Sequence, residues 1–322
     1  MEKKNVLKSL RTIDKDQFKP VFTAIVLIVI VVIFSLINPV FCSFTNLHSI
    51  FLNAVPVGLV SIGMCVLVMG GFFDMGTGLV ACMAGMMVGP LMDRGIPVPV
   101  IILIALCMGT ACGALSGVAV SYLNMNAWIS TFALSQIYRT ILYVTTDGIP
   151  FTLASEKYSA FTQLGRIRVF GVIQLPIVVL LAVYVLSYLF LRFRRLGRSV
   201  YLVGNNPAAA QICGINLHGT RMFMFIFANI LSVVAGLLFT ARAGLAQPFA
   251  CESYTFEGIA SAFVGGAAAG KGNLISVFIG ALIVFTVKSG LVLIGLPDFY
   301  QHMATGVIML IAVLFQTQHK KS

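Results

Sequence analysis

Three ionisable side chains, Asp74, Arg139 and Lys288, fall inside otherwise apolar stretches of this 322-residue chain. A charged group at the centre of a bilayer costs roughly 2.5–3.5 kcal/mol, so such residues are candidates for a functional path or an internal ion pair. Lys288 stands between Thr286 and Ser289, which indicates either a polar stripe lining a path or an ion pair inside the protein. Asp74 can cap a helix, line the path or pair with a cation, whereas Arg139 is expected to reach toward the membrane surface.

A glycine-rich stretch, GGAAAGKG at 265–272, nearly matches the phosphate-binding pattern G-x-x-x-x-G-K-[ST]. Gly272 stands where a hydroxyl would hold Mg²⁺, and residues 256–264 are expected to form an apolar helix instead of the required strand. We interpret the stretch as a turn between two membrane helices, with Lys271 at the cytoplasmic surface. The chain is therefore predicted to hold no ATP site of its own and not to be an enzyme.

Histidines and cysteines do not form a recognisable reactive or metal-binding pattern. The four histidines, at 48, 218, 302 and 319, are scattered, and the seven cysteines form no CxxC pair. A structural metal site needs ligands at close, regular spacing, so no metal and no cofactor are expected. The cysteines lie mostly in apolar segments and are interpreted as small core residues.

The composition requires lipid as the solvent for most of the chain. Hydrophobic residues make up 59% of the sequence, charged residues 10%, and the mean hydropathy is +1.00. A bilayer core of about 30 Å needs roughly 17–25 helical residues for each crossing. We predict an all-α, polytopic transmembrane bundle of about ten helices, near 20–38, 55–70, 75–92, 97–123, 128–145, 173–191, 221–240, 256–270, 274–296 and 300–316. The second and eighth segments are short and glycine-rich, so either could be a broken or re-entrant helix.

Lysine and arginine positions predict the orientation, because cytoplasmic loops carry an excess of both. With ten crossings and both termini in the cytoplasm, most of the 21 lysine and arginine residues fall on the cytoplasmic side. Residues 1–19 are then a cytoplasmic segment, and residues 20–322 form a single transmembrane domain. This topology, together with attraction to anionic lipid, explains the net charge of +11, so no nucleic-acid binding is needed to account for it. The expected location is a bacterial inner membrane.

Glycines recur at helical spacing in two segments. Gly109, Gly113 and Gly117 are four residues apart, and Gly85 and Gly89 repeat the spacing in the preceding segment. Such faces allow neighbouring membrane helices to approach closely. We interpret them as packing surfaces, although glycine is also simply frequent in membrane helices.

The longest polar interruption spans residues 192–221 and is predicted to be a cytoplasmic loop. Asn206 can cap a helix that begins at Pro207, and Gly214 is a natural stop. A short, weakly charged helix of this kind suits docking into a groove on another subunit. The alternative is an interfacial connector without a partner.

The segment RLGRSVYLVGNNPAAAQICGIN at 195–216 closely resembles the coupling loop of permeases in the ribose, xylose, arabinose and autoinducer-2 class of ATP-binding-cassette importers. This class lies in the branched-chain amino acid/monosaccharide permease family. The resemblance continues in GGFFDMGTG at 70–78, ARAGLAQP at 241–248, GIASAFVGGAAAGKGN at 258–273 and GLVLIGLPDFYQ at 290–301. Lys288 departs from the pattern, since relatives tend to carry asparagine there.

The resemblance implies a permease subunit that moves a monosaccharide-like solute into the cytoplasm by alternating access. Its implied partners are a cytoplasmic ATPase subunit, an extracytoplasmic solute-binding protein and a second permease copy or paralogue within membrane lipid. The family's coupling residues correspond here to Gly204, Asn205, Asn206, Ala208, Ala209, Gly214, Ile215 and Asn216.

For the solute path we predict the ionisable Asp74 and Lys288, together with four residues around the 128–145 segment that could face the dimer axis: Asn124, Asn126, Trp128 and Gln136. Nucleosides and branched-chain amino acids are the alternative solutes. An ion-gradient secondary transporter is the alternative mechanism, but it would require carboxylates at the membrane midplane, where acidic residues are nearly absent. A scaffold subunit without transport activity would not need the capped loop helix.

Overall fold

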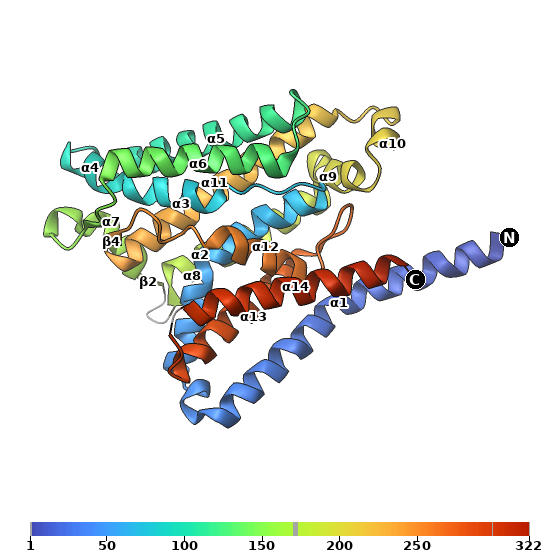
Figure 1. Ribbon diagram of the computed structural model, residues 1–322, viewed down its shortest axis with the longest axis horizontal. Coiled ribbons are helices and arrows are strands. Elements are labelled where there is room, and N and C mark those ends of the chain that lie inside the picture. Colours follow the sequence, from blue (N-terminus) through green and yellow to red (C-terminus); the bar gives the residue numbers. More distant parts are fainter. Residues whose placement is uncertain (1, 170–172, 298, 322) are drawn as a thin grey trace.

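A computed structural model of the chain describes residues 2–169, 173–297 and 299–321, with only the helical backbone described for 2–19 and 315–321 (Figure 1). Helices dominate it, in the chain order α1 (Glu2–Ile37), α2 (Phe44–Met69), α3 (Thr77–Met86), α4 (Val88–Asp93), α5 (Val98–Ser121), α6 (Ala127–Thr146), α7 (Ser159–Arg166), α8 (Leu175–Phe193), α9 (Arg195–Asn205), α10 (Pro207–Ile212), α11 (Leu217–Ala243), α12 (Tyr254–Val264), α13 (Leu274–Leu293) and α14 (Phe299–Lys321). Short 3₁₀ turns, η1 (Pro39–Cys42) and η2 (Glu156–Tyr158), lie in the connections.

Each predicted apolar segment lies on one or two of these helices. Within the described residues, six helical stretches are long and apolar enough to cross a membrane: Pro20–Ile37, Phe44–Met69, Val98–Ser121, Leu175–Phe193, Leu217–Ala243 and Leu274–Leu293. The predicted count of about ten crossings stays a prediction, because other apolar helices are shorter. The eighth segment is indeed short, since α12 ends at Val264.

The prediction of a short second segment was wrong. Helix α2 has 26 residues and begins at Phe44, where the Ser43 hydroxyl accepts a hydrogen bond from the Asn46 backbone N–H. Polar residues such as Asn46 and Asn53 interrupt the hydropathy of its first turns, which made the helix look shorter than it is. Helix α2 also holds Pro56 in its interior.

Figure 1 separates the helix connections into two ends of the molecule. Both termini, α9 and α10 lie toward the right of the view, and we call this the inner end. Helices α4 and α7 and the short strands lie toward the left, and we call this the outer end. The predicted placement of both termini on one side is consistent with this arrangement.

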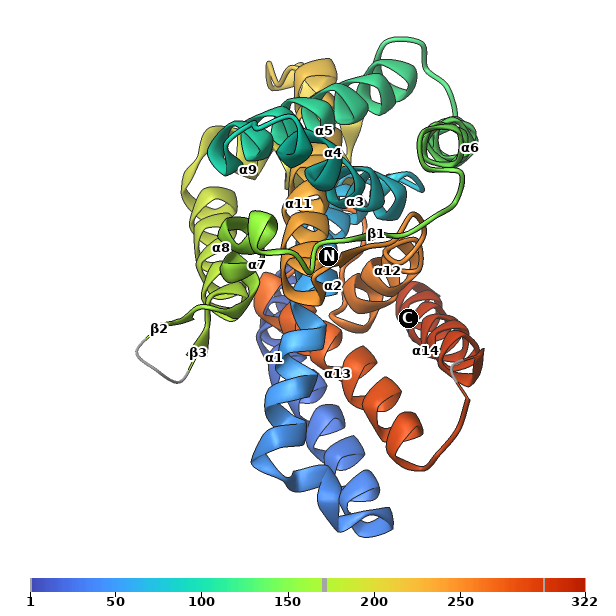
Figure 2. The ribbon, with the colours of Figure 1, turned by 90° about the vertical axis from the view of Figure 1, so that its left-hand side faces the viewer.

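The core is built around α2 and α11. Every residue from Ala54 to Met69 is buried, because α2 packs against α11, α12 and α13. Helix α1 is very different: Leu36 is 82% exposed and Ile28 is 61% exposed, as expected for side chains that face lipid. Figure 2, which views the outer end, places α2 near the middle and α6 and α14 toward the periphery.

The predicted glycine packing faces form on α5 and at Gly85, whereas Gly89, in α4, lies against the Phe151 ring in the connection after α6 instead of against a helix. A Cβ atom added at Gly113 would lie 2.6 Å from the Ile226 Cα, and one at Gly109 would lie 2.4 Å from a Val233 methyl. Gly85 likewise lies against Thr240, so α3 and α5 both approach α11 through glycine. These contacts explain why α11 can pack at the centre of the bundle.

The all-α prediction holds apart from two minimal strand pairs in the outer connections. Strands β1 (Phe151–Thr152) and β4 (Leu245–Ala246) pair antiparallel, as do β2 (Arg168–Val169) and β3 (Ile173–Gln174). Nearby, Lys157 Nζ donates to Asp93 Oδ1 at 2.7 Å, and this hydrogen bond raises the pKa of the Lys157 ammonium. These contacts fasten the long connection from α6 to α8 onto the outer end.

Candidate functional site

The predicted loop helix forms at the inner end. Helix α10 spans Pro207–Ile212, and Asn206 Oδ1 accepts a hydrogen bond from the Ala209 backbone N–H at 3.1 Å. Gly214 adopts φ of +77°, which terminates the helix as the sequence predicts. Asn216 then caps the start of α11 through Gly219, with a distance of 2.9 Å between Oδ1 and N.

Helix α10 presents most of its surface to the exterior of the chain. Ala208, Ala209 and Gly214 are exposed, and Ile215 is half-buried. The Ile212 side chain is 88% exposed, which is unusual for a large apolar residue in a polar connection. Ala210 is buried and anchors the helix.

Helix α9 was not predicted, although it forms the other half of the loop. Its buried residues Gly197, Val200 and Val203 lie on one face at helical spacing. Gly197 permits a close approach to α8, because a Cβ atom there would lie 2.5 Å from the Leu191 Cα. The spacing of the apolar residues was the available signal, and the glycines at 197 and 204 obscured it.

Three segments meet at the carboxyl end of α9. The Gly270 backbone N–H donates to the Met69 carbonyl oxygen at 2.8 Å, joining the glycine-rich turn to the end of α2. A Cβ atom added at Gly204 would lie 1.7 Å from the same oxygen, and Asn205 lies against Gly270. We call Gly204, Asn205, Gly270 and Met69 the inner junction. It connects the loop helices directly to the most buried helix of the bundle.

The glycine-rich turn is not a phosphate-binding loop. It follows α12, an apolar helix as expected, and Ala268 and Lys271 close the turn through two backbone hydrogen bonds of 2.8 Å. Its amide at Gly270 is already occupied by Met69, and Lys271 is exposed at the inner end.

A large cavity lies at the outer end, with a volume of about 1020 Å³. The outer ends of α2, α11, α13 and α14, the first turn of α12 and the connection preceding it line this cavity. Lys288 and Ser289 are part of its wall, whereas the buried Thr286 is not. The predicted polar stripe is therefore only partly formed.

Lys288 forms an ion pair within the protein. Its Nζ donates to Glu257 Oε1 at 2.7 Å, and the Nζ also lies 5.2 Å from the centre of the Phe285 ring. The Glu257 side chain is 1% exposed and the Lys288 side chain 15% exposed. The two sequence alternatives for Lys288, a wall residue and an ion-pair partner, thus occur together.

Asp74 does not cap α3 in the predicted way. Helix α3 begins after Gly76 without a side-chain cap, because Asp74 Oδ1 accepts from the Gly76 N–H in the preceding turn at 2.8 Å. The other carboxylate oxygen accepts from Asn229 Nδ2 at 2.8 Å. Asp74 is buried and lies outside the cavity wall, so in this structure it fastens the turn before α3 to α11.

The remaining predicted path residues lie on and before α6. Asn124 adopts φ of +51°, and Asn126 Oδ1 caps α6 by accepting from the Trp128 N–H at 3.0 Å. Trp128 is 51% exposed and meets Phe73 edge to face. Gln136 is exposed on α6. The structure does not bring these residues to the outer cavity that contains Lys288.

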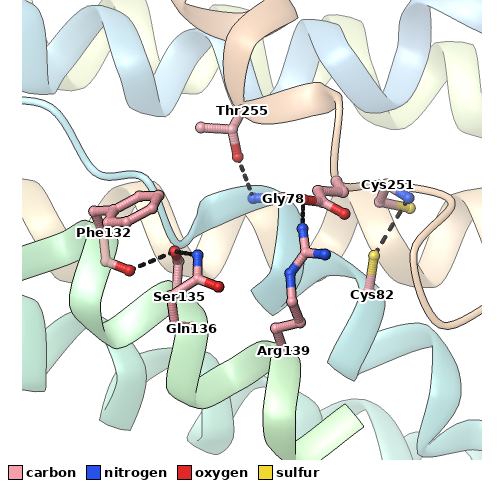
Figure 3. A network of polar contacts seen from close by, with 9 residues as sticks. Gly78, Cys82, Phe132, Ser135, Gln136, Arg139, Cys251 and Thr255 are labelled. Carbon is pink, nitrogen blue, oxygen red and sulfur yellow. Dashed lines mark hydrogen bonds and ion pairs between the residues drawn. The ribbon is translucent and has the colours of Figure 1, made fainter. Parts of the chain in front are cut away.

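Arg139 was expected to reach toward the membrane surface, and the structure places it in an ion pair. Its guanidinium, seen at Arg139 in Figure 3, forms an ion pair with Glu252 on the connection before α12. Arg139 also lies 5.6 Å from the centre of the Phe249 ring. In the same network, the Gly78 N–H donates to the Thr255 hydroxyl at 2.8 Å, so α3 is tied to the first turn of α12 and α6 to the connection before it.

The cysteine prediction is correct for the four buried side chains, Cys65, Cys82, Cys112 and Cys251, and wrong for the exposed Cys42, Cys107 and Cys213. Among the described residues, no group of three or more His, Cys, Asp or Glu side chains could hold a metal ion.

Comparison with known proteins identifies the family. A family model described as "Branched-chain amino acid transport system / permease component" matches residues 46–313. The chain is 33% identical to the ribose import permease protein RbsC of Haemophilus influenzae, with 90% of each chain covered. It is 31% identical to RbsC of Bacillus subtilis, covering 92% of this chain and 91% of the relative.

The D-allose transport system permease protein AlsC of Escherichia coli is 30% identical to the chain, with 90% of this chain and 89% of the relative covered. No solved structure matches the chain. The family match spans more than half of the sequence and includes both the loop helices and the outer cavity. The chain therefore belongs to the branched-chain amino acid transport system permease family and is a multi-pass protein of the inner membrane.

Proposed function

We propose that this chain is the permease subunit of an ATP-binding-cassette importer that moves a neutral monosaccharide into the cytoplasm. The observation that carries the proposal is the exposed, capped helix α10 at the inner end, in a chain whose relatives are named for ribose and allose transport. In this proposal both termini and α10 face the cytoplasm, and the apolar segments make about ten crossings.

Helix α10 is the proposed contact with a separate ATPase subunit. Its exposed Ile212 and neighbouring alanines offer a small apolar surface that suits a groove on a partner. Gly204 and Asn205 would pass movement of the loop to α2 and to the glycine-rich turn through the inner junction. The remaining proposed coupling residues shape the ends of α10 and the start of α11.

A solute-binding protein is the proposed partner at the outer end, and a second permease copy or paralogue would complete the pore. The family description also makes a branched-chain amino acid a candidate solute. The cavity favours a neutral solute, because its two lining carboxylates, Glu252 and Glu257, are balanced by Arg242 and Lys288.

The test is uptake of labelled ribose, xylose, arabinose, galactose, leucine and a nucleoside into vesicles that contain this chain with its ATPase and binding protein. ATP-dependent accumulation of one sugar is the expected result. Accumulation of leucine or the nucleoside instead of a sugar would contradict the proposed solute class. Uptake driven by an ion gradient without ATP would contradict the proposed ATP-driven mechanism.

Gly214→Leu tests the docking role of α10 in the same assay. Space around Gly214 is open, but its positive φ strains any other residue by about 1–2 kcal/mol, so the end of α10 should shift. We expect an inserted chain that loses most ATP-linked uptake. Unchanged uptake would reject docking through α10. Gly295→Leu is the matched control, since this glycine has φ of +84° and open space in the connection between α13 and α14.

A further inference from the structure

The outer cavity has the size and wall of a small-molecule site. Its volume of about 1020 Å³ is close to the upper end of the roughly 300–1,000 Å³ range of ligand pockets. The wall combines aromatic rings with polar side chains from α2, α11, α12, α13 and α14. Phe239 and Tyr254 meet edge to face with ring centres 6.0 Å apart, and Phe285 lies beside Lys288.

Glu257 is the residue that points to a ligand. Its side chain is 1% exposed, Oε1 is held by Lys288, and Oε2 is buried without a hydrogen-bond partner among the described residues. A buried carboxylate oxygen without a donor is costly, and native proteins rarely leave one. A ligand hydroxyl that entered the cavity could supply the missing donor.

Further polar groups of the wall are already oriented by their neighbours. The Arg242 guanidinium donates to Asn53 Oδ1 across the space between α11 and α2. The Ser289 hydroxyl and Asn46 Oδ1 lie 3.1 Å apart and join α13 to α2. These groups offer both donors and acceptors, which a solute with several hydroxyls requires.

We propose that this cavity binds a neutral, polyhydroxylated solute of monosaccharide size, with one hydroxyl donating to Glu257 Oε2. The balanced charges of the wall match an uncharged solute, and the aromatic rings offer apolar faces for its C–H groups. Lys288 is a positioning residue in this site, because it holds the Glu257 carboxylate through the other oxygen. The proposal rests on the proposed function and names the residues that receive the solute.

The experiment is saturation-transfer-difference NMR on the purified chain in nanodiscs, with ribose, xylose, galactose and leucine as probes and empty nanodiscs as the background. This method detects weak binding without ATPase or binding protein. We expect transfer to at least one sugar and none to leucine. Absence of sugar transfer above the background, or transfer confined to lipid protons, would overturn the proposed site.

Two variants assign the signal to the cavity. Glu257→Leu/Lys288→Leu removes the acceptor without leaving a lone buried charge, and we expect the sugar affinity to fall at least tenfold. Asn53→Trp changes an exposed residue at the cavity wall and should weaken binding similarly even if the double variant fails to assemble. Glu156→Leu, at an exposed glutamate outside the cavity, is the matched control. Wild-type affinity in Asn53→Trp and in an assembled double variant would overturn the site.

Uptake by the complete transporter separates the two proposals. Sugar uptake in the absence of sugar binding to the cavity would reject only the site. A transporter that accumulates leucine or a nucleoside and excludes every sugar would reject the proposed function itself.

Discussion

The Glu257–Lys288 pair shows how a charge can be accommodated in an apolar helix. Glu257 lies in the first turn of α12, where the helix dipole favours a carboxylate, and Lys288 reaches it from the neighbouring α13. Removing two charges from water is costly, so such a pair adds little net stability over apolar residues of similar volume. Removing one partner alone is much more damaging, because the other charge then stays buried and unpaired.

Lys288→Met is therefore expected to destabilise the chain by about 3–5 kcal/mol. The measurement is thermal unfolding of the purified protein in detergent, followed by a fluorescent reporter of cysteine exposure. Glu257→Gln/Lys288→Met should recover most of the lost stability, because it leaves no lone charge. A single variant that unfolds at the wild-type temperature would contradict the expectation that removal of Lys288 leaves a buried, unpaired charge.

The sequence identified Lys288 as unusual but did not identify its partner. Glu257 stands in a predicted apolar segment just as Lys288 does, and a lone acid matched with a lone base in neighbouring segments was the available signal. The sequence also identified Asp74 as an unusual acidic residue, and the structure buries it with two hydrogen-bond partners, Gly76 and Asn229. Its contact with Asn229 could not be predicted, because the two positions are 155 residues apart and meet only after α3 packs on α11.

At the scale of elements, close backbone contacts through glycine determine the arrangement. The inner junction places α9, the glycine-rich turn and the end of α2 so close together that Gly204 has no room for a side chain. The obstacle is the Met69 carbonyl oxygen, which is part of a backbone hydrogen bond and cannot rotate away as a flexible side chain could.

Gly204→Ala is expected to displace α9 from α2 and to reduce ATP-linked uptake at least tenfold while the chain still inserts. The physical reason is the Cβ position, 1.7 Å from the Met69 oxygen, which forces backbone movement. Uptake per inserted molecule is the measurement. Gly219→Ala is the control near the same loop, since its nearest neighbour is a side-chain atom of Asn216 at 3.2 Å. Equal uptake by the two variants would contradict a role for the inner junction.

Gly113→Leu tests the glycine face between α5 and α11. The added side chain would collide with the backbone of Ile226 and Phe225, so the two helices must separate and the folded yield should fall sharply. Ala111→Leu, on the exposed face of the same helix, should be tolerated because it adds apolar surface toward lipid. The monodisperse fraction after detergent extraction distinguishes them, and equal fractions would exclude Gly113 as a packing contact.

The elements also show what the sequence could and could not predict. Helix α10 was predicted with its cap and its stop because Asn206, Pro207 and Gly214 are local signals. Helix α9 was missed because Gly197 and Gly204 look like loop residues until the neighbours that require them are known. The division of the third segment into α3 and α4 was missed as well, since the break at Met87 has no glycine or proline at that position.

At the scale of the whole molecule, two native cysteines report on orientation. Cys42 is exposed in η1 at the turn between α1 and α2, and Cys213 is exposed just after α10. A chain with cytoplasmic termini places Cys42 outside and Cys213 inside, since the second half of α1, Pro20–Ile37, is long and apolar enough to cross the membrane before η1.

Labelling with a membrane-impermeant maleimide tests this orientation. In right-side-out vesicles we expect modification of Cys42 and protection of Cys213, with the reverse in inside-out vesicles. Cys42→Ser and Cys213→Ser identify which site carries the label. Modification of Cys213 from outside in sealed, right-side-out vesicles would place α10 at the wrong face for a cytoplasmic ATPase.

The helical bundle as a class was predictable because lipid leaves few alternatives to helices for a single apolar chain of this kind. The order of helices along the chain was largely predictable for the same reason. Which helix lies at the centre was not predictable, because α1 and α2 are both strongly apolar, yet one lies at the periphery and the other is enclosed.

The enclosure of α2 has a consequence for how the chain is made. During synthesis α2 leaves the ribosome long before α11, α12 and α13, the helices that cover it in the finished protein. Its residues from Ala54 to Met69 must therefore be stable first among lipid tails and later among protein side chains. A nearly uniform apolar surface meets both conditions. The polar first turns of α2, which contain Asn46 and Asn53, can stay at the membrane surface until those helices are made. The order in which the helices are synthesised thus constrains the sequence of α2, separately from the requirements of the final fold.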